Sequence, residues 1–212
     1  MVYALYDIPA GSELTMSYTN GDNTNPSYLL ARYGFLDESS PATFCKLIIE
    51  HPSQELVDIG YGPSRLLFYT RTGDVTPEVW DVLLYHTVLQ EDNDDWNMQQ
   101  SFYQAHVSGD TMIKQQIHDQ YQEQTAAALL KHVEDTLFVL DRLAEKAVGR
   151  DLAVHPRLPL IQRHNKYVRD TFMKVRSRIM SGALRPSSSS SLPSEYPQED
   201  QQYDIIFEDE YR

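Results

Sequence analysis

The spacing of the apolar residues changes once along this chain, and that change restricts the fold more than any other feature. Before residue 76 the apolar residues form short runs separated by turn residues, a pattern typical of β-strands. After Thr76 they recur every three or four residues over long stretches, which is typical of amphipathic helices. The sequence therefore predicts an α+β fold in which a β segment precedes a helical region.

The β segment is expected to contain five strands and one short helix. The strands are predicted at residues 2–8 (VYALYDI), 13–18 (ELTMSY), 42–50 (ATFCKLIIE), 55–60 and 65–70 (RLLFYT). The stretch SYLLARYGF (residues 27–35) predicts one or two helical turns, ended by Gly34. Gly60-Tyr61-Gly62-Pro63 opens no helix, as a phosphate-binding loop would, and is read as a turn.

The helical region is expected to begin at Thr76, where an N-cap residue precedes Pro77 and an acid. Ser108 or Asp110 caps a second, long helix that runs to about Val148. Another helix is predicted from near Pro159 to Gly182. The apolar stripes of these two long helices are Leu130, Val133, Leu137, Leu140, Ala144 and Val148, and Ile161, Val168, Phe172, Val175 and Ile179. Two such stripes predict an antiparallel packed pair.

Charge and cysteine content exclude several classes of function. The formal net charge is −13 at pH 7, which argues against nucleic acid or an anionic membrane as the main partner and suits a basic protein. One cysteine, Cys45, rules out a disulfide framework and a cysteine zinc cluster within the chain. No apolar run is long enough to span a membrane, and the N-terminus lacks a secretory pattern. We therefore expect an intracellular protein, cytoplasmic or nuclear.

Residues 183–212 differ in composition from the rest of the chain. This segment is rich in Ser and Pro and carries seven acidic and two basic residues. Such a composition buries too little apolar surface to offset its ordering entropy and predicts a disordered acidic tail. The last stretch, YDIIFEDEYR, mixes acids with aromatic and aliphatic residues, and the alternative is a short motif that orders on a basic partner.

The helical region carries no motif for a known chemistry. No two histidines have the i, i+4 spacing of a helical metal site, and neither HExxH nor GxSxG is present. The run Asp92, Asp94 and Asp95 lacks the glycine and the ligand spacing of a calcium loop. We therefore predict no metal site and assign the histidines structural roles.

An ordered set of motifs stands near the N-terminus. DIPAGSELTMSY (residues 7–18) is followed by Asn25 and then by LLARYGF (residues 29–35). This pattern resembles the C-terminal half of a SET domain of the group typified by the Rubisco large-subunit methyltransferase. The layout is also similar, since in that group the SET core is followed by strands and a helical substrate-binding domain. The implied domains are residues 1–41 (SET), 42–75 (connecting strands), 76–182 (helical, substrate-binding-like) and 183–212 (tail).

The resemblance implies methyl transfer from S-adenosylmethionine to a lysine or histidine of a protein substrate. In the family, the tyrosine that ends the ELxxxY strand points at the methyl-transfer centre, which corresponds to Tyr18. The second tyrosine corresponds to Tyr33, beside the substrate channel, and Phe35 would lie near the cofactor. Such a site aligns and desolvates the two reactants and lowers the pKa of the target amine.

The family's N-terminal half, with a Gly-rich cofactor segment and an Asn-His pair, has no counterpart before Asp7. We therefore expect this chain to be a C-terminal fragment that is not active alone. Two alternatives remain: a catalytically inactive SET remnant that acts as a protein-binding module, and an unrelated α+β interaction protein.

Overall fold

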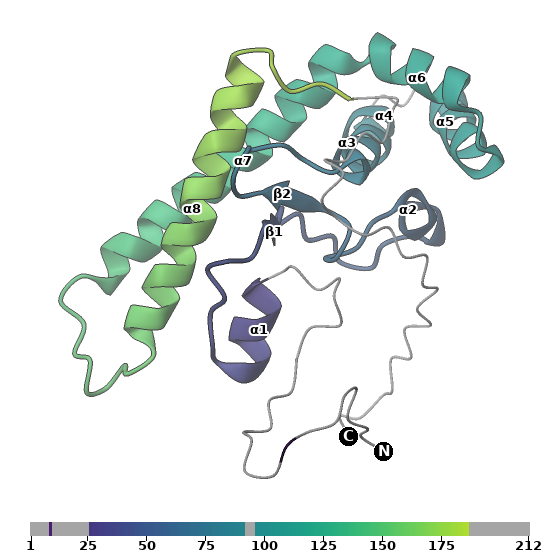
Figure 1. Cartoon of the computed structure of the whole chain (residues 1–212). Helices are drawn as coiled ribbons and strands as arrows, with labels where there is room; N and C mark the ends of the chain where they lie inside the picture. The colour runs from purple at the N-terminus through teal and green to yellow at the C-terminus, as the bar shows by residue number, and fades with distance from the viewer. Residues whose placement is uncertain (1–8, 10–25, 92–95, 187–212) are drawn as a thin grey trace.

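The computed structural model describes residues 9, 26–91 and 96–186 of the 212-residue chain. Within these residues the fold is mixed α and β, mostly helical, with one two-stranded antiparallel sheet (Figure 1). The α+β class is thereby confirmed. The strands expected at residues 2–8 and 13–18 lie outside the described residues, as does the predicted tail from residue 187 onward.

The sheet pairs β1 (Ala42–Phe44) with β2 (Leu67–Tyr69), and Thr43 lies opposite Phe68. The strand predicted over residues 42–50 is therefore much shorter than expected. After Phe44 only one more sheet-like hydrogen bond follows, from the Cys45 amide to the Leu66 carbonyl at 2.9 Å. Lys46 then adopts a left-handed conformation with φ of 64°, which turns the chain out of the strand.

The strand predicted at residues 55–60 is wrong, because these residues form a helix, α2 (Gln54–Ile59). The Ser53 hydroxyl accepts the Leu56 amide and caps its N-terminus. Leu56 and Ile59, three residues apart, are buried, whereas Val57 is exposed. Gly60 ends the helix with φ of 116°.

Helices begin at Thr76 as predicted, in a connected series. α3 (Pro77–Leu83) continues through a π-helical turn, η1 (Leu84–Val88), into α4 (Leu89–Glu91). α5 (Trp96–Ser108) and α6 (Thr111–Gln120) follow, and the Asp110 carboxylate caps α6 by accepting the Ile113 amide at 3.0 Å.

The long helix expected from Ser108 or Asp110 to Val148 is two helices. α6 ends at Tyr121, whose φ and ψ of −108° and 18° are not helical, and α7 (Gln122–Ala147) starts directly after it. The Tyr121 side chain is buried in the core, so packing holds the break in place. Pattern alone carries no signal for such an interruption.

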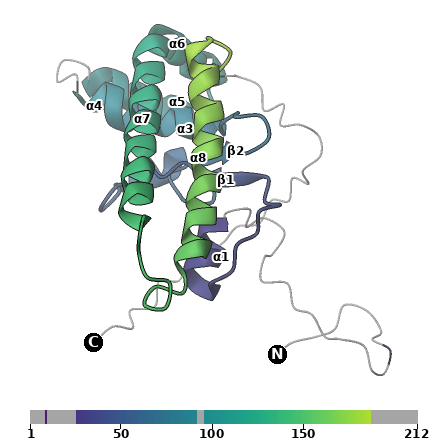
Figure 2. The ribbon, with the colours of Figure 1, turned by 90° about the vertical axis from the view of Figure 1, so that its left-hand side faces the viewer.

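α7 and α8 (Leu158–Met180) form the predicted antiparallel pair, side by side in both ribbon views (Figure 2). Val133, Leu137 and Leu140 of α7 and Val168, Phe172 and Val175 of α8 are buried, as the stripes predict. The stripe positions at the other end of the pair are not buried. Ala144, Val148 and Ile161 are exposed, so the apolar stripes run on beyond the core.

One core joins the sheet, α2, α3 and the α7–α8 pair. The ring of Phe68 on β2 lies 4.9 Å from that of Phe172 on α8, and both side chains are fully buried. The turn after β2 also touches α8: a Cβ added to Gly73 would lie 2.9 Å from the backbone of Lys174. The sheet and the helical pair are therefore one packed body.

Candidate functional site

The structure describes two of the three residues assigned by the SET resemblance, Tyr33 and Phe35. Tyr18 lies outside the described residues, so its assignment to the methyl-transfer centre stays a prediction. Tyr33 and Phe35 lie at the end of α1 (Pro26–Tyr33), the short helix predicted for LLARYGF. Gly34, with φ of 75°, ends α1 by donating its amide to the Leu30 carbonyl.

The turn at Gly34 brings the two aromatic rings together on the surface. Their centroids are 6.2 Å apart with an interplanar angle of 21°, so the rings stack. Tyr33 is 43 % and Phe35 40 % exposed, and the Arg32 guanidinium lies 5.7 Å from the Tyr33 ring centre. This aromatic pair is therefore a partly exposed cluster with a cation beside one ring.

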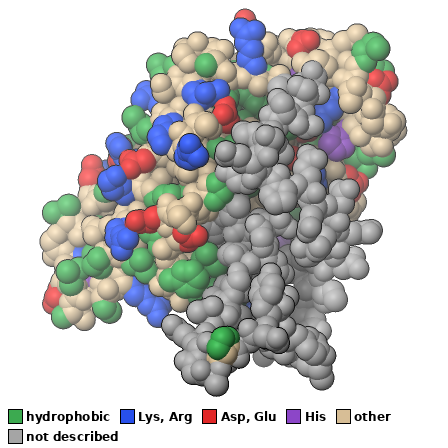
Figure 3. Space-filling view, viewed as in Figure 1, with side chains coloured by type: hydrophobic (Ala, Val, Ile, Leu, Met, Phe, Trp, Pro, Cys, Tyr) green, Lys and Arg blue, Asp and Glu red, His purple; other side chains and the backbone are tan. Residues whose placement is uncertain are grey.

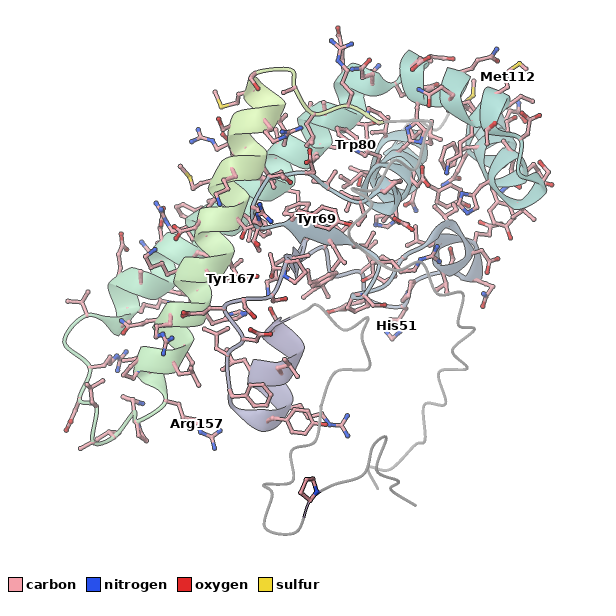
Figure 4. The ribbon with its side chains drawn as sticks, viewed as in Figure 1. His51, Tyr69, Trp80, Met112, Arg157 and Tyr167 are labelled. Carbon is pink, nitrogen blue, oxygen red and sulfur yellow. The ribbon has the colours of Figure 1, made fainter. Side chains whose placement is uncertain are left out.

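The segment that carries the aromatic pair is attached to α8. The Tyr167 hydroxyl donates to the Ser40 carbonyl at 2.6 Å, and the Arg163 Nε donates to Glu38 at 3.0 Å. Figure 4 labels Tyr167 on α8, beside the chain that leads from α1 to β1. The LLARYGF segment is thus held directly against the helical pair.

A polar chain links α1, the residue after β1 and α8. The Lys46 ammonium donates to the Ser27 hydroxyl oxygen at 2.8 Å, and that oxygen lies 2.8 Å from His164 Nε2. Lys46 only donates, so the Ser27 oxygen accepts from it, and the same hydroxyl shares a hydrogen bond with His164 Nε2. His164 Nδ1 then faces the Asn165 side-chain oxygen at 3.4 Å.

This polar chain borders a pocket of about 460 Å³ between Lys46, two residues after β1, and the α7–α8 pair. Lys46, His132 and His164 contribute to its wall, together with Asp135 and the apolar Leu140. Burial lowers the pKa of Lys46. Burial also lowers the pKa of His164, and the nearby Lys46 lowers it further. The pocket wall therefore combines three nitrogen-bearing side chains with the Asp135 carboxyl, a set that suits a small polar group.

His132 lies on α7 and is a structural link rather than a free ligand. Its Nε2 is 2.5 Å from the Cys45 carbonyl oxygen, and burial lowers its pKa. Cys45 itself is 1 % exposed, and burial raises the pKa of its thiol to about 12. Cys45 is therefore a small buried core residue.

A second polar cluster joins α3, α5 and α6. Asp81, 3 % exposed, accepts the Lys114 ammonium at 2.5 Å and lies 2.8 Å from His118 Nε2. His106 Nδ1 lies 3.8 Å from the same carboxylate. Burial lowers the pKa of His106, and the positive charge of Lys114 lowers it further. The cluster is therefore an ion-pair network around the buried Asp81 carboxylate, and it ties three helices together.

A groove of about 980 Å³ lies between the C-terminal end of α7 and the N-terminal part of α8. Its lining is mostly apolar and includes Leu143, Ala144 and Ile161. Hydrophobic side chains gather over this end of the molecule, with basic side chains beside them (Figure 3). The five basic residues of the lining are Lys146, Arg150, Arg157, Lys166 and Arg169.

Sequence reasoning missed the contact between Ser27 and His164. These residues are 137 positions apart, and no spacing rule connects them. Among the described residues no group of histidine, cysteine and acidic side chains is placed to hold a metal ion. None of the described helices has both the length and the apolar character of a membrane span.

Comparisons with protein families, with curated proteins and with solved structures found no match to this chain.

Proposed function

We propose that this chain is the C-terminal, substrate-holding portion of a SET-type protein methyltransferase that uses S-adenosylmethionine. The observation that carries the proposal is the Tyr33–Phe35 pair. It follows the DIPAGSELTMSY segment in the expected order, and its rings stack on the surface. An exposed aromatic pair of this kind suits a surface that the cofactor and the remainder of a catalytic core would cover.

The position of the pair relative to the helices supports the same proposal. The segment 27–40 is tied to α8 through His164, Arg163 and Tyr167. A protein substrate bound along the helical pair would therefore be held at a fixed distance from the aromatic pair. Fixed positioning is the main protein contribution to an in-line methyl transfer.

The test is methyl transfer by the protein expressed from the complete open reading frame that contains this chain. Tritiated S-adenosylmethionine is supplied with a cell extract as acceptor. Tyr18→Phe removes the hydroxyl assigned to the methyl-transfer centre, and we expect transfer to fall at least about tenfold while the cofactor still binds. Tyr103→Phe, which removes an exposed hydroxyl that donates to Asp58 on α2, is the matched control. Equal transfer by the wild type and both variants would contradict the proposal.

The second candidate is a protein-binding module without catalysis, and the α7–α8 groove favours it. An apolar groove of this size with a basic rim suits an acidic, hydrophobic peptide. The two candidates differ in calorimetry with S-adenosylmethionine. The enzyme predicts saturable binding by the complete product, whereas the binding module predicts none.

A further inference from the structure

The α7–α8 groove exposes apolar side chains of the kind that helices normally bury. Ala144 and Ile161 continue the apolar stripes of α7 and α8, yet both are exposed and line the groove. Leu143 is 44 % and Ile161 43 % exposed. Helical stripes normally mark the face that a neighbouring element covers. Among the described residues, no element packs over this end of the α7 and α8 stripes.

The charges around the groove restrict what could cover it. Lys166 pairs with Asp170 at 2.6 Å, and Arg169 pairs with Asp141 at 2.8 Å. The remaining three cations of the lining, which are Lys146, Arg150 and Arg157, have no acidic partner among the described residues. Arg157 projects from the lower end of α8 in Figure 4. The cover should therefore be apolar in its centre and acidic at its margins.

The chain itself contains such a segment. Residues 203–211 read YDIIFEDEY, with Ile205, Ile206 and Phe207 in the centre and four acids around them. No basic residue lies within this stretch. A protein with a net charge of −13 gains by placing such a segment on its basic surface, because elsewhere the segment meets mainly like charge.

The length of the intervening chain allows the contact within one molecule. The chain leaves α8 at the end opposite the groove (Figure 1), and Leu184 is buried in the core. Helix α8, with 23 residues, is about 35 Å long at about 1.5 Å per residue. A chain of the length of residues 187–202 can reach up to about 50 Å when fully extended. The groove is therefore within reach of residues 203–211.

We propose that residues 203–211 of this chain dock in the groove between the end of α7 and the start of α8. The apolar centre of the segment covers Leu143, Ala144 and Ile161, and its acids face Lys146, Arg150 and Arg157. The contact is intramolecular. It blocks the groove to other acidic peptides, which must compete with a tethered segment at a high effective concentration. The proposal is independent of methyl transfer.

The test uses the full chain with a nitroxide label at Gln202→Cys. Cys45 is buried and its thiol pKa is raised to about 12, so the introduced thiol is the one that reacts. In amide correlation spectra, we expect the label to broaden residues 143–147 and 157–161. The amides around Met112 on α6, at the far side of the molecule in Figure 4, should stay sharp.

Three variants and a mixing experiment decide the result. Ile206→Asp, and Arg150→Glu combined with Arg157→Glu, should each lower the docked population on the order of tenfold. Lys131→Glu with Arg142→Glu changes the net charge equally on α7 outside the groove and should leave the broadening intact. Absent or uniform broadening, or equal broadening in all variants, overturns the proposal. Broadening in a mixture of labelled chains and isotope-enriched unlabelled chains assigns the groove to a second copy and also overturns it.

Discussion

Removing the His164 side chain should release α1 from α8. His164→Ala deletes the imidazole that is hydrogen-bonded to the Ser27 hydroxyl at 2.8 Å, and empties a site that is only 8 % exposed. A neutral hydrogen bond contributes about 1 kcal/mol, and the incompletely refilled space costs about 1 kcal/mol more. A total of about 2 kcal/mol should raise the opening equilibrium of α1 on the order of 30-fold.

Hydrogen exchange measured by mass spectrometry follows this opening directly. Peptides that cover residues 29–35 should exchange faster in His164→Ala, whereas those of α5 should not change. His155→Ala, which removes an exposed histidine before α8, is the control and should leave α1 exchange as in the wild type. Unchanged exchange of α1 in His164→Ala would refute the reasoning, since the contact then does not hold the helix.

The same contact predicts a pH dependence with a defined sign. Burial and the neighbouring Lys46 lower the pKa of His164 in the folded state, so the unfolded state binds the proton more readily. The contribution is therefore complete above the unfolded pKa of about 6.5 and is lost as the pH falls through the lower folded pKa. Protonated Nε2 cannot accept the Ser27 hydroxyl. Exchange of α1, corrected for the intrinsic rate, should rise on acidification in the wild type but not in His164→Ala.

Two further perturbations test the packing that supports the site. Asp81→Ala leaves the partly buried Lys114 cation without its carboxylate and should lower the free energy of unfolding by about 1.5–3 kcal/mol in urea titrations, whereas Asp135→Ala, in an exposed pair, should cost less than about 1 kcal/mol. Gly73 and Gly149 share a φ of 73°, but a Cβ at Gly73 would lie 2.9 Å from the α8 backbone and one at Gly149 would meet nothing. Gly73→Ala should therefore lower the melting temperature more than Gly149→Ala, and equal effects would exclude the crowding.

The helical layout followed from the sequence where local signals agreed with packing. Thr76 with Pro77 marked a helix start, and the period of three and four residues marked α7 and α8. The sequence predicts a strand at residues 55–60 in place of α2, because a six-residue helix shows less than two full turns of its period. The break at Tyr121 depends on burial of that side chain in a core built from distant segments.

The candidate site was only partly accessible from the sequence. Tyr33 and Phe35 could be selected because their motif is contiguous, and the turn at Gly34 follows from its left-handed conformation. The contact of Ser27 with Lys46 and His164 depends on three elements meeting in space. The exposure of Ala144 and Ile161 could not be foreseen either, since periodicity identifies an apolar face but not its cover.

Photo-crosslinking of radiolabelled S-adenosylmethionine tests the central claim most directly. The protein is expressed from the complete open reading frame that contains this chain, irradiated with the bound cofactor and digested with trypsin. Cleavage after Arg32 and Lys46 separates the peptide that carries Tyr18 from the peptide of residues 33–46, which carries the aromatic pair. The account predicts label in the peptide of residues 33–46, reduced by excess unlabelled cofactor. Label confined to other peptides, or no specific label at all, would contradict it.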